Sequence, residues 1–544
     1  MLFKGTERLG TTNYEKERPH LERITALYEE LFKQRDPVGR RALYAKIDAE
    51  NQAAAAYAIP NEFDRLYGGL AFKDVNAHTS TEETVYEVSF PSNRAEAWAQ
   101  TETERFAHPV FRLFQSELEA VYEENNMGQD DAETALWLAS QAATFKGHPY
   151  ARSTIGLPEH LKNPSLAKMY AFYDAWYRPD NMAVILSGDF DRAEMLALLE
   201  RNFASLRART PTVPTLPAGD FEPLKGAERS EIFYPGEEAV RISWRTPAQN
   251  HPDNDALAVL ERLLGDPQSG LLNLHLSQTQ KVKSVGAEVW QLGEAGAFLL
   301  NAAPKEGQSL EQAESLLMAE IERIKAGEFY DADLRAAITN IEVEEKLRLE
   351  SNTKRVASMV ESYIAGTEWR RSVLKLERLR RVTKADLMRV AHEYLGEART
   401  VVYRREGDTK RPPIDKPGFT PITIDPTRSS PLAAELAAIP APELKPRWLK
   451  EGKDYVIDSF GWGKLYWTKN PVSDLFSLKF VIPGGLRADP RMRVNVGIDP
   501  DELSPLVGNG RSFGEFRLRP AQAPIVEPGH RQDRRLGGQR GNSR

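Results

Sequence analysis

The apolar residues of this chain change their spacing several times, from the helical period of about 3.6 residues to the alternating period of a strand. Residues 13–59 are highly charged, have apolar side chains at helical spacing and predict a solvated helical hairpin with a break at Pro37. Residues 86–90 alternate between apolar and polar side chains, which predicts a strand that ends at Pro91. Helices and antiparallel strands mixed in this way predict an α+β fold.

The same two patterns recur as far as about residue 405. The first group has predicted helices at 109–126, 131–144, 165–176 and 192–206 and a short predicted strand at 182–186. The second group has predicted strands at 240–244, 285–292 and 400–403 and predicted helices at 254–264, 271–279, 310–326, 332–361 and 384–394. Because the two groups follow a similar order of elements, they indicate a weak internal repeat.

Two proline-rich stretches divide the chain, since proline fixes φ and favours extended connectors. The first contains Pro211, Pro214, Pro217 and Pro223, and the second is the linker at 406–450. The predicted domains are 1–215, with a helical insertion at about 13–62; 216–405; and the start of a third similar domain at 451–490, with strands at 455–460 and 475–482. Residues 491–544 have no periodicity and are predicted to be a disordered or out-of-frame tail.

Composition excludes several classes of protein. The chain has 72 lysine and arginine residues against 79 aspartate and glutamate residues, a net charge of −7, whereas nucleic-acid-binding proteins have an excess of basic residues. The arginine-rich tail could be a basic arm, but it lacks interleaved aromatic residues, and we expect no nucleic-acid partner. No apolar run approaches the roughly 20 residues of a transmembrane helix, so we expect no membrane span.

The sequence contains no cysteine and nine histidines. Disulfides, thiol nucleophiles and cysteine-containing metal sites are therefore excluded. The carboxylates that stand out are Glu117 and Glu124, which are seven residues apart on a predicted helix. Two helical turns, about 10 Å, separate them, so both project from one face. Such a pair is commonly a solvated helix face, but one carboxylate could bind a metal while the other supports it.

Several segments, in this order and spacing, resemble the pitrilysin/insulinase family of zinc metallopeptidases, which includes the mitochondrial processing peptidases and has an inverted His-x-x-Glu-His zinc motif. The segments are Met1–Glu7, Asn76–Tyr86, Glu117–Glu124, Gly147–Tyr150, Tyr177–Asp189 and 240–401. The first is similar to the stretch that follows the motif, the second to the substrate-binding edge strand and the third to the helix with the third zinc ligand. The helical insertion is similar to one found in some bacterial members.

The resemblance implies repeated mitochondrial-processing-peptidase-like lobes, each an antiparallel sheet flanked by helices. It also implies a zinc-dependent endopeptidase that hydrolyses unfolded peptides or small proteins in a clamshell chamber. By this resemblance Glu124 is the third zinc ligand and Glu117 its supporting carboxylate. Asn76 and Ala77 bind the substrate backbone by adding it as a strand.

The chain departs from this family because it contains no His-x-x-Glu-His motif. His148 and His160 are twelve positions apart, whereas the motif places its histidines four apart, and His78 and His108 are better explained as surface or interface residues. The motif is expected immediately before Met1. We therefore expect a chain truncated at its N-terminus and also at its C-terminus, which retains no zinc by itself and is inactive alone.

Two other functions fit the same sequence. The chain could be a noncatalytic peptide-binding subunit that completes the chamber of a catalytic partner, or a structural core subunit like those of respiratory complexes that resemble this family. The compartment is open: periplasmic or extracellular if a signal peptide preceded the chain, and cytoplasmic otherwise.

Overall fold

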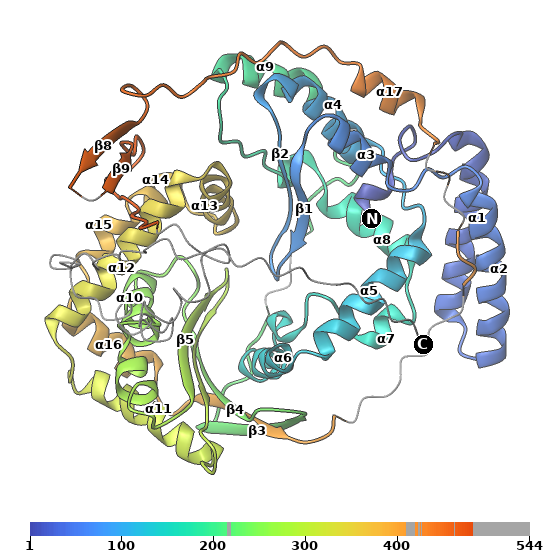
Figure 1. Cartoon of the computed structure of the whole chain (residues 1–544). Helices are drawn as coiled ribbons and strands as arrows, with labels where there is room; N and C mark the ends of the chain where they lie inside the picture. Colours follow the sequence, from blue (N-terminus) through green and yellow to red (C-terminus); the bar gives the residue numbers. More distant parts are fainter. Residues whose placement is uncertain (215–218, 410–418, 423–424, 426, 462, 482–544) are drawn as a thin grey trace, which may run out of the picture. The chain divides into compact units, whose positions relative to one another are not determined.

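The computed structural model describes residues 1–214, 219–409, 419–422, 425, 427–461 and 463–481 (Figure 1). The chain divides into two units, Met1–Lys479 and Phe480–Arg544, and the elements below all lie in the first. Helices combined with largely antiparallel sheets confirm the predicted α+β class. No helix of the described part is long and apolar enough to cross a membrane. The predicted tail at 491–544 lies outside the described residues.

The charged N-terminal region forms the predicted helical hairpin. Helix α1 spans Tyr14–Lys33 and α2 spans Pro37–Ala55, and the two pack side by side (Figure 1). The break between them is where the sequence predicts it, because Asp36 caps α2 by accepting a 2.7 Å hydrogen bond from the Gly39 N–H. Pro37 follows at the first helical position, where its missing N–H costs nothing.

The remaining elements before residue 215 are mainly helical. They are η1 (Leu2–Lys4), α3 (Glu62–Gly69), β1 (Lys73–Thr79), β2 (Thr84–Ser89), α4 (Ala95–Ala107), α5 (Phe114–Gln129), α6 (Ala132–Thr144), α7 (Pro158–Leu161), α8 (Leu166–Trp176) and α9 (Arg192–Phe203), with short 3₁₀ turns η2 (Ser92–Arg94), η3 (Pro149–Ala151) and η4 (Pro179–Asn181). Strand β2 and helices α6, α8 and α9 confirm the sequence predictions to within a few residues.

Two predictions in this region are wrong. Helix α5 begins at Phe114 and not at residue 109, because Pro109 forms a bridge with Thr6 and Leu113 adopts a left-handed φ of 54°. Residues 182–186 form no strand. A strand needs a hydrogen-bonded neighbour, and in the described part of the chain this apolar run has none.

The region from residue 227 to 406 contains a five-stranded sheet in the order β3-β7-β4-β6-β5. Its strands are β3 (Ala227–Tyr234), β4 (Ala239–Thr246), β5 (Ser284–Gln291), β6 (Gly296–Ala303) and β7 (Arg399–Glu406). All neighbours are antiparallel except β3 and β7, which are parallel. Sequence analysis predicted β4, β5 and β7 but missed β3 and β6. The continuous apolar run of β6 does not distinguish a buried strand from a buried helix by its period.

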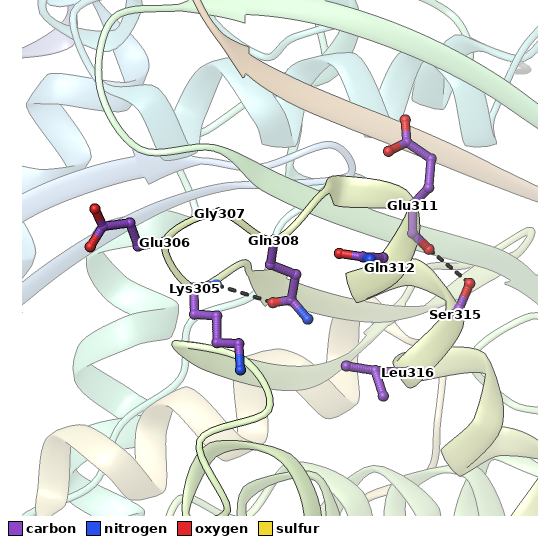
Figure 2. A pocket seen from close by; sticks show the side chains of 8 residues that line it. All are labelled: Lys305, Glu306, Gly307, Gln308, Glu311, Gln312, Ser315 and Leu316. Carbon is purple, nitrogen blue, oxygen red and sulfur yellow. Dashed lines mark hydrogen bonds between the residues drawn. The ribbon is translucent and has the colours of Figure 1, made fainter.

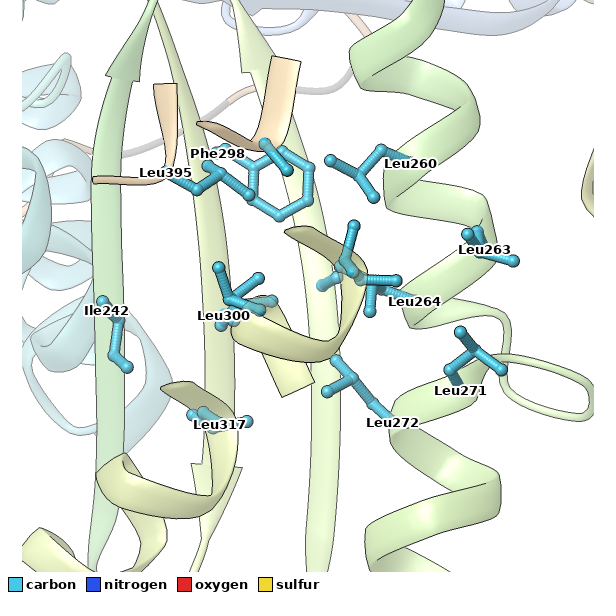
Figure 3. Packing of buried hydrophobic residues seen from close by; sticks show 14 of the residues in the cluster. Ile242, Leu260, Leu263, Leu264, Leu271, Leu272, Phe298, Leu300, Leu317 and Leu395 are labelled. Carbon is cyan, nitrogen blue, oxygen red and sulfur yellow. The ribbon is translucent and has the colours of Figure 1, made fainter. Parts of the chain in front are cut away.

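Helices cover one face of this sheet. The helices that contribute to the core on this face are α10 (Asn254–Gly265), α11 (Leu310–Lys325), α12 (Asp331–Glu350), α15 (Lys375–Leu379) and α16 (Lys384–Tyr394), with a π-helical turn at Asn273–Ser277. Helices α13 (Asn352–Ile364) and α14 (Trp369–Val373) lie between α12 and α15 in the chain. Figure 3 shows Ile242, Phe298 and Leu300 of the sheet packed with Leu260 of α10 and Leu317 of α11. All five are fully buried, and each contributes about 1.5–3 kcal/mol relative to exposure.

The predicted helix at 332–361 is two helices. Ser351, between α12 and α13, has an extended conformation with ψ of 137°. Serine competes poorly for helical positions because its hydroxyl offers the backbone other hydrogen bonds, and the apolar period alone does not reveal such a break.

The last described elements are α17 (Pro431–Ala437), β8 (Val456–Phe460) and β9 (Gly463–Trp467). Strand β8 confirms the prediction at 455–460. The strand predicted at 475–482 is wrong over 475–481, which is not assigned to a strand, and residue 482 lies outside the described part. The partner of β8 is instead β9, only two residues further along the chain.

One buried ion pair ties the N-terminal segment to helix α1 and to the turn that precedes α5. The guanidinium of Arg112 donates to both carboxylate oxygens of Glu17, at 3.0 and 3.1 Å, and to the backbone oxygens of Lys4, Thr6 and Leu9. Arg112 and Glu17 are almost completely buried. All the donors of the guanidinium face acceptors of the protein, so the charge is stabilised away from water.

Replacing Arg112 with Met should lower the free energy of unfolding by about 3–5 kcal/mol, because Glu17 would remain buried without its partner. Urea denaturation measures the change. Arg18→Ala is the control, since Arg18 is half-exposed and should change stability by less than about 0.5 kcal/mol. A loss below about 1 kcal/mol for Arg112→Met would show that the pair does not anchor the segment.

Burial also perturbs a carboxyl on α10. The pKa of Glu261 is raised to about 7, mainly because burial disfavours the charged form, and nearby Glu344, Glu288 and Asp266 add to this effect while Arg262 opposes it. The unfolded carboxyl titrates near 4.5. Between these values the folded state binds more protons than the unfolded state, so stability falls as the pH rises from about 4.5 to about 7.

Glu261→Gln should remove this loss. Near pH 4.5 the variant and the original chain should unfold at similar urea concentrations, and at pH 8 the variant should be more stable by roughly 3 kcal/mol. Urea denaturation at pH 4.5, 6, 7 and 8 tests this, with the exposed Glu306→Gln as control. An equal difference at every pH would contradict the assigned titration.

Candidate metal-ligand and peptide-binding site

Helix α5 holds the two carboxylates that the sequence singles out. Its inner face is fixed by Phe114, Leu118 and Tyr122, which are buried, and the Phe114 ring meets Tyr28 of α1 edge-on with 5.0 Å between centroids. The helix therefore has a defined rotation about its axis.

Glu117 lies near the start of α5 and is already paired. Its carboxylate is 2.7 Å from the Lys4 Nζ and 3.7 Å from the amino group of Met1, and its side chain is 29% exposed. Burial lowers the pKa of the Met1 amino group, and the negative charge of Glu117 opposes that shift. The predicted supporting carboxylate is thus paired with cations of the N-terminal segment.

Glu124 lies two turns further along α5 and is exposed. No hydrogen bond or ion pair of its carboxylate is found within the described part of the chain. Over the same residues, no group of three or more histidine, aspartate and glutamate side chains is placed to hold a metal ion. A peptidase zinc centre needs three protein ligands. The donors present here do not fit that centre, because Glu124 is a single carboxylate without imidazole neighbours.

The candidate histidines serve other purposes. His78 is half-exposed on β1, 3.5 Å from Glu87, and His108 and His160 are exposed. His148 is buried, and its side chain caps the η3 turn by accepting a hydrogen bond from the Tyr150 N–H. Its Nε2 also lies 3.0 Å from Glu294, a contact that the sequence does not predict.

Strand β1 contains the predicted peptide-binding residues. Asn76 is opposite Glu87 of β2, and Ala77 is opposite Tyr86. In the described part of the chain β1 pairs with β2 alone, so its other edge is unpaired. Both residues therefore lie on a strand edge of the kind that can accept an extended peptide. A bulge between Lys73 and Asn76 shifts the register just before this edge.

Sequence analysis missed a pocket of about 600 Å³ in the region from residue 227 to 406 (Figure 2). It is formed by the loop before α11 and the first turns of that helix: Lys305, Glu306, Gly307, Gln308, Glu311, Gln312, Ser315 and Leu316. Its polar side chains bond locally, since Gln308 accepts from the Lys305 N–H and Ser315 donates to the Glu311 carbonyl oxygen. None of the predicted site residues lines it.

Comparison with known proteins relates this fold to that of peptidases. Residues 165–341 match the family described as Peptidase M16 inactive domain. A protease structure from Helicobacter pylori superposes with a TM-score of 0.60 at 23% identity, over 64% of this chain and 85% of that one. The peptidase fold is therefore shown for most of the described region.

Sequence relatives point to the same family. Zinc protease PqqE of Helicobacter pylori is 25% identical over 384 residues, which cover 67% of this chain and 83% of that protein. Probable zinc protease PqqL of Escherichia coli is 35% identical over 150 residues, which cover 26% of this chain and 16% of that protein. The chain is thus similar to proteins named zinc proteases, and the predicted resemblance to this family is confirmed.

If Glu124 is a zinc ligand, it should bind zinc once the two missing histidines are supplied. The Met1 amino group lies 3.7 Å from Glu117, so a helical His-x-x-Glu-His segment joined ahead of Met1 would end beside the start of α5. We expect this fusion to bind one equivalent of zinc and its Glu124→Gln variant to bind roughly 100-fold or more weakly. Competition with a fluorescent zinc chelator measures both affinities.

Glu119→Gln is the matched control for this experiment, because Glu119 is exposed on the same helix but projects in another direction. Equal zinc affinity of the Glu124→Gln fusion and its parent would overturn the assignment of Glu124 as a ligand.

Proposed function

We propose that this chain is the peptide-binding part of a zinc endopeptidase of this family. It receives an unfolded peptide as an added strand on β1 and does not hydrolyse it alone. The observation that carries the proposal is the unpaired edge of β1 at Asn76 and Ala77. Family membership supports peptides as ligands, since relatives of this chain are named zinc proteases.

The chemistry of the available donors explains the expected inactivity. Zinc peptidases need two histidines and a general base in addition to the glutamate ligand, and the printed sequence contains no motif that supplies them. Glu124 alone can supply only a small fraction of the zinc-binding free energy of a complete structural site, which is roughly 10–16 kcal/mol. Zinc therefore belongs to the complete catalytic unit, and this chain does not retain it.

The second candidate is a noncatalytic subunit that binds peptide beside a catalytic partner. The match of residues 165–341 to the inactive domain of the family favours it, as does the pairing of Glu117 with Lys4. Peptide binding on β1 is common to both functions, and therefore the binding experiment comes first.

Strand addition predicts a binding pattern that alternates along the peptide. In a β-strand, only every second N–H points toward a given neighbouring strand. A fluorescent ten-residue peptide should therefore lose about 100-fold in affinity when three inward N–H groups are methylated, since each hydrogen bond contributes about 1 kcal/mol. Methylation of the three intervening residues should be tolerated. Fluorescence anisotropy measures both analogues.

A scrambled peptide of the same composition is the control, and it should bind within about threefold because main-chain bonds carry the affinity. Mass spectrometry should recover all peptides intact with or without a metal chelator. Equal binding of the two methylated analogues would exclude strand addition, and cleavage that the chelator suppresses would contradict the expected inactivity.

A further inference from the structure

The turn between β1 and β2 contacts the turn between β5 and β6. Both carboxylate oxygens of Glu82, at the tip of the first hairpin, accept the N–H of Gly293, at 2.9 and 3.0 Å. A side chain from one turn thus binds the backbone of another that is 211 residues away. Because the acceptor is ionised, these hydrogen bonds are stronger than those between neutral groups.

The hydroxyl of Tyr150 bonds to both turns. It donates to Glu82 and accepts from the Glu294 N–H at 3.1 Å. The pKa of Tyr150 is raised, first by burial and then by the bond to Glu82, so the phenol keeps the proton that it donates. The same hydroxyl therefore acts as donor to one turn and acceptor from the other.

A buried aromatic cluster holds Tyr150 in place. Its ring packs edge-on against Phe145, with 5.7 Å between centroids, and is 6% exposed. The adjacent His148 stacks on Phe221 with 4.1 Å between centroids, and its Nε2 lies 3.0 Å from Glu294. A polar group on such an immobile ring costs little entropy to hold in position.

We propose that Glu82, Tyr150 and the Gly293–Glu294 backbone form a latch that positions the β1 edge for peptide. The inference rests on the proposed function of β1. Only two residues separate Thr79, the end of β1, from Glu82. A two-stranded hairpin is marginally stable by itself, so fixing its tip restricts the motion of the whole edge. The latch residues are positioning residues, and none of them contacts the peptide in this scheme.

The latch predicts coupled changes in mobility and affinity. Glu82→Ala and Tyr150→Phe should each accelerate amide hydrogen exchange in peptides that cover residues 73–89 and 291–296 by at least about threefold. Each should also weaken binding of the fluorescent peptide by about tenfold, because a mobile edge must be ordered on binding. Mass spectrometry and fluorescence anisotropy provide the two readouts.

Two further variants make the test specific. Glu83→Ala, at the neighbouring position of the same turn, should change neither readout. Gly293→Ala acts from the opposite side, because a Cβ at this position would lie 2.8 Å from the Glu82 Oε1, and it should loosen the hairpin as Glu82→Ala does. The double variant Glu82→Ala/Tyr150→Phe should be little worse than Glu82→Ala, since Glu82→Ala already removes the bonds of the hairpin tip to both Gly293 and Tyr150.

Each outcome decides a separate statement. Unchanged exchange at 73–89 in both single variants would overturn the latch itself. Faster exchange with unchanged peptide affinity would overturn its role in positioning. If the original chain bound no peptide, the proposed function would fail together with the positioning role, and hydrogen exchange would still decide whether the latch exists.

Discussion

The arrangement of the elements before residue 215, the first part of the structure, depends on one buried guanidinium that needs hydrogen-bond acceptors. Arg112 donates to Glu17 and to three backbone oxygens between Lys4 and Leu9. Gly5 makes room for it, because a Cβ there would lie 2.1 Å from the Arg112 Nη1, and its φ of +122° also favours glycine. This interaction fixes the N-terminal segment and α1 against the turn that precedes α5, and it places Lys4 beside Glu117.

The second part, residues 227–406, is held together mainly by apolar packing. Its five-stranded sheet packs on helices through a continuous apolar core, and helix α6 of the first part covers β4 and β7. Leu136 of α6 is buried with Ala239 and Val402 of this sheet. Apolar burial therefore brings the β5–β6 turn to a defined place, and the polar bonds of Glu82 and Tyr150 then select one orientation of the β1–β2 hairpin.

The candidate site combines a strand edge that can bind peptide with a helix that has one ligand-type carboxylate. The peptide edge is made of backbone, so its selectivity for side chains is low. The helix presents Glu124 to solvent while Lys4 neutralises Glu117.

The sequence by itself determined the helical hairpin with its break at Pro37, the spacing of Glu117 and Glu124, and the absence of the histidine motif. These follow from period, capping and residue type, which are local properties. Only the tertiary structure decided the start of α5, the neighbours of Glu117 and the contact of Glu82 with Gly293. Each depends on residues brought together from distant parts of the chain by burial and hydrogen bonding, and no local pattern encodes such a meeting.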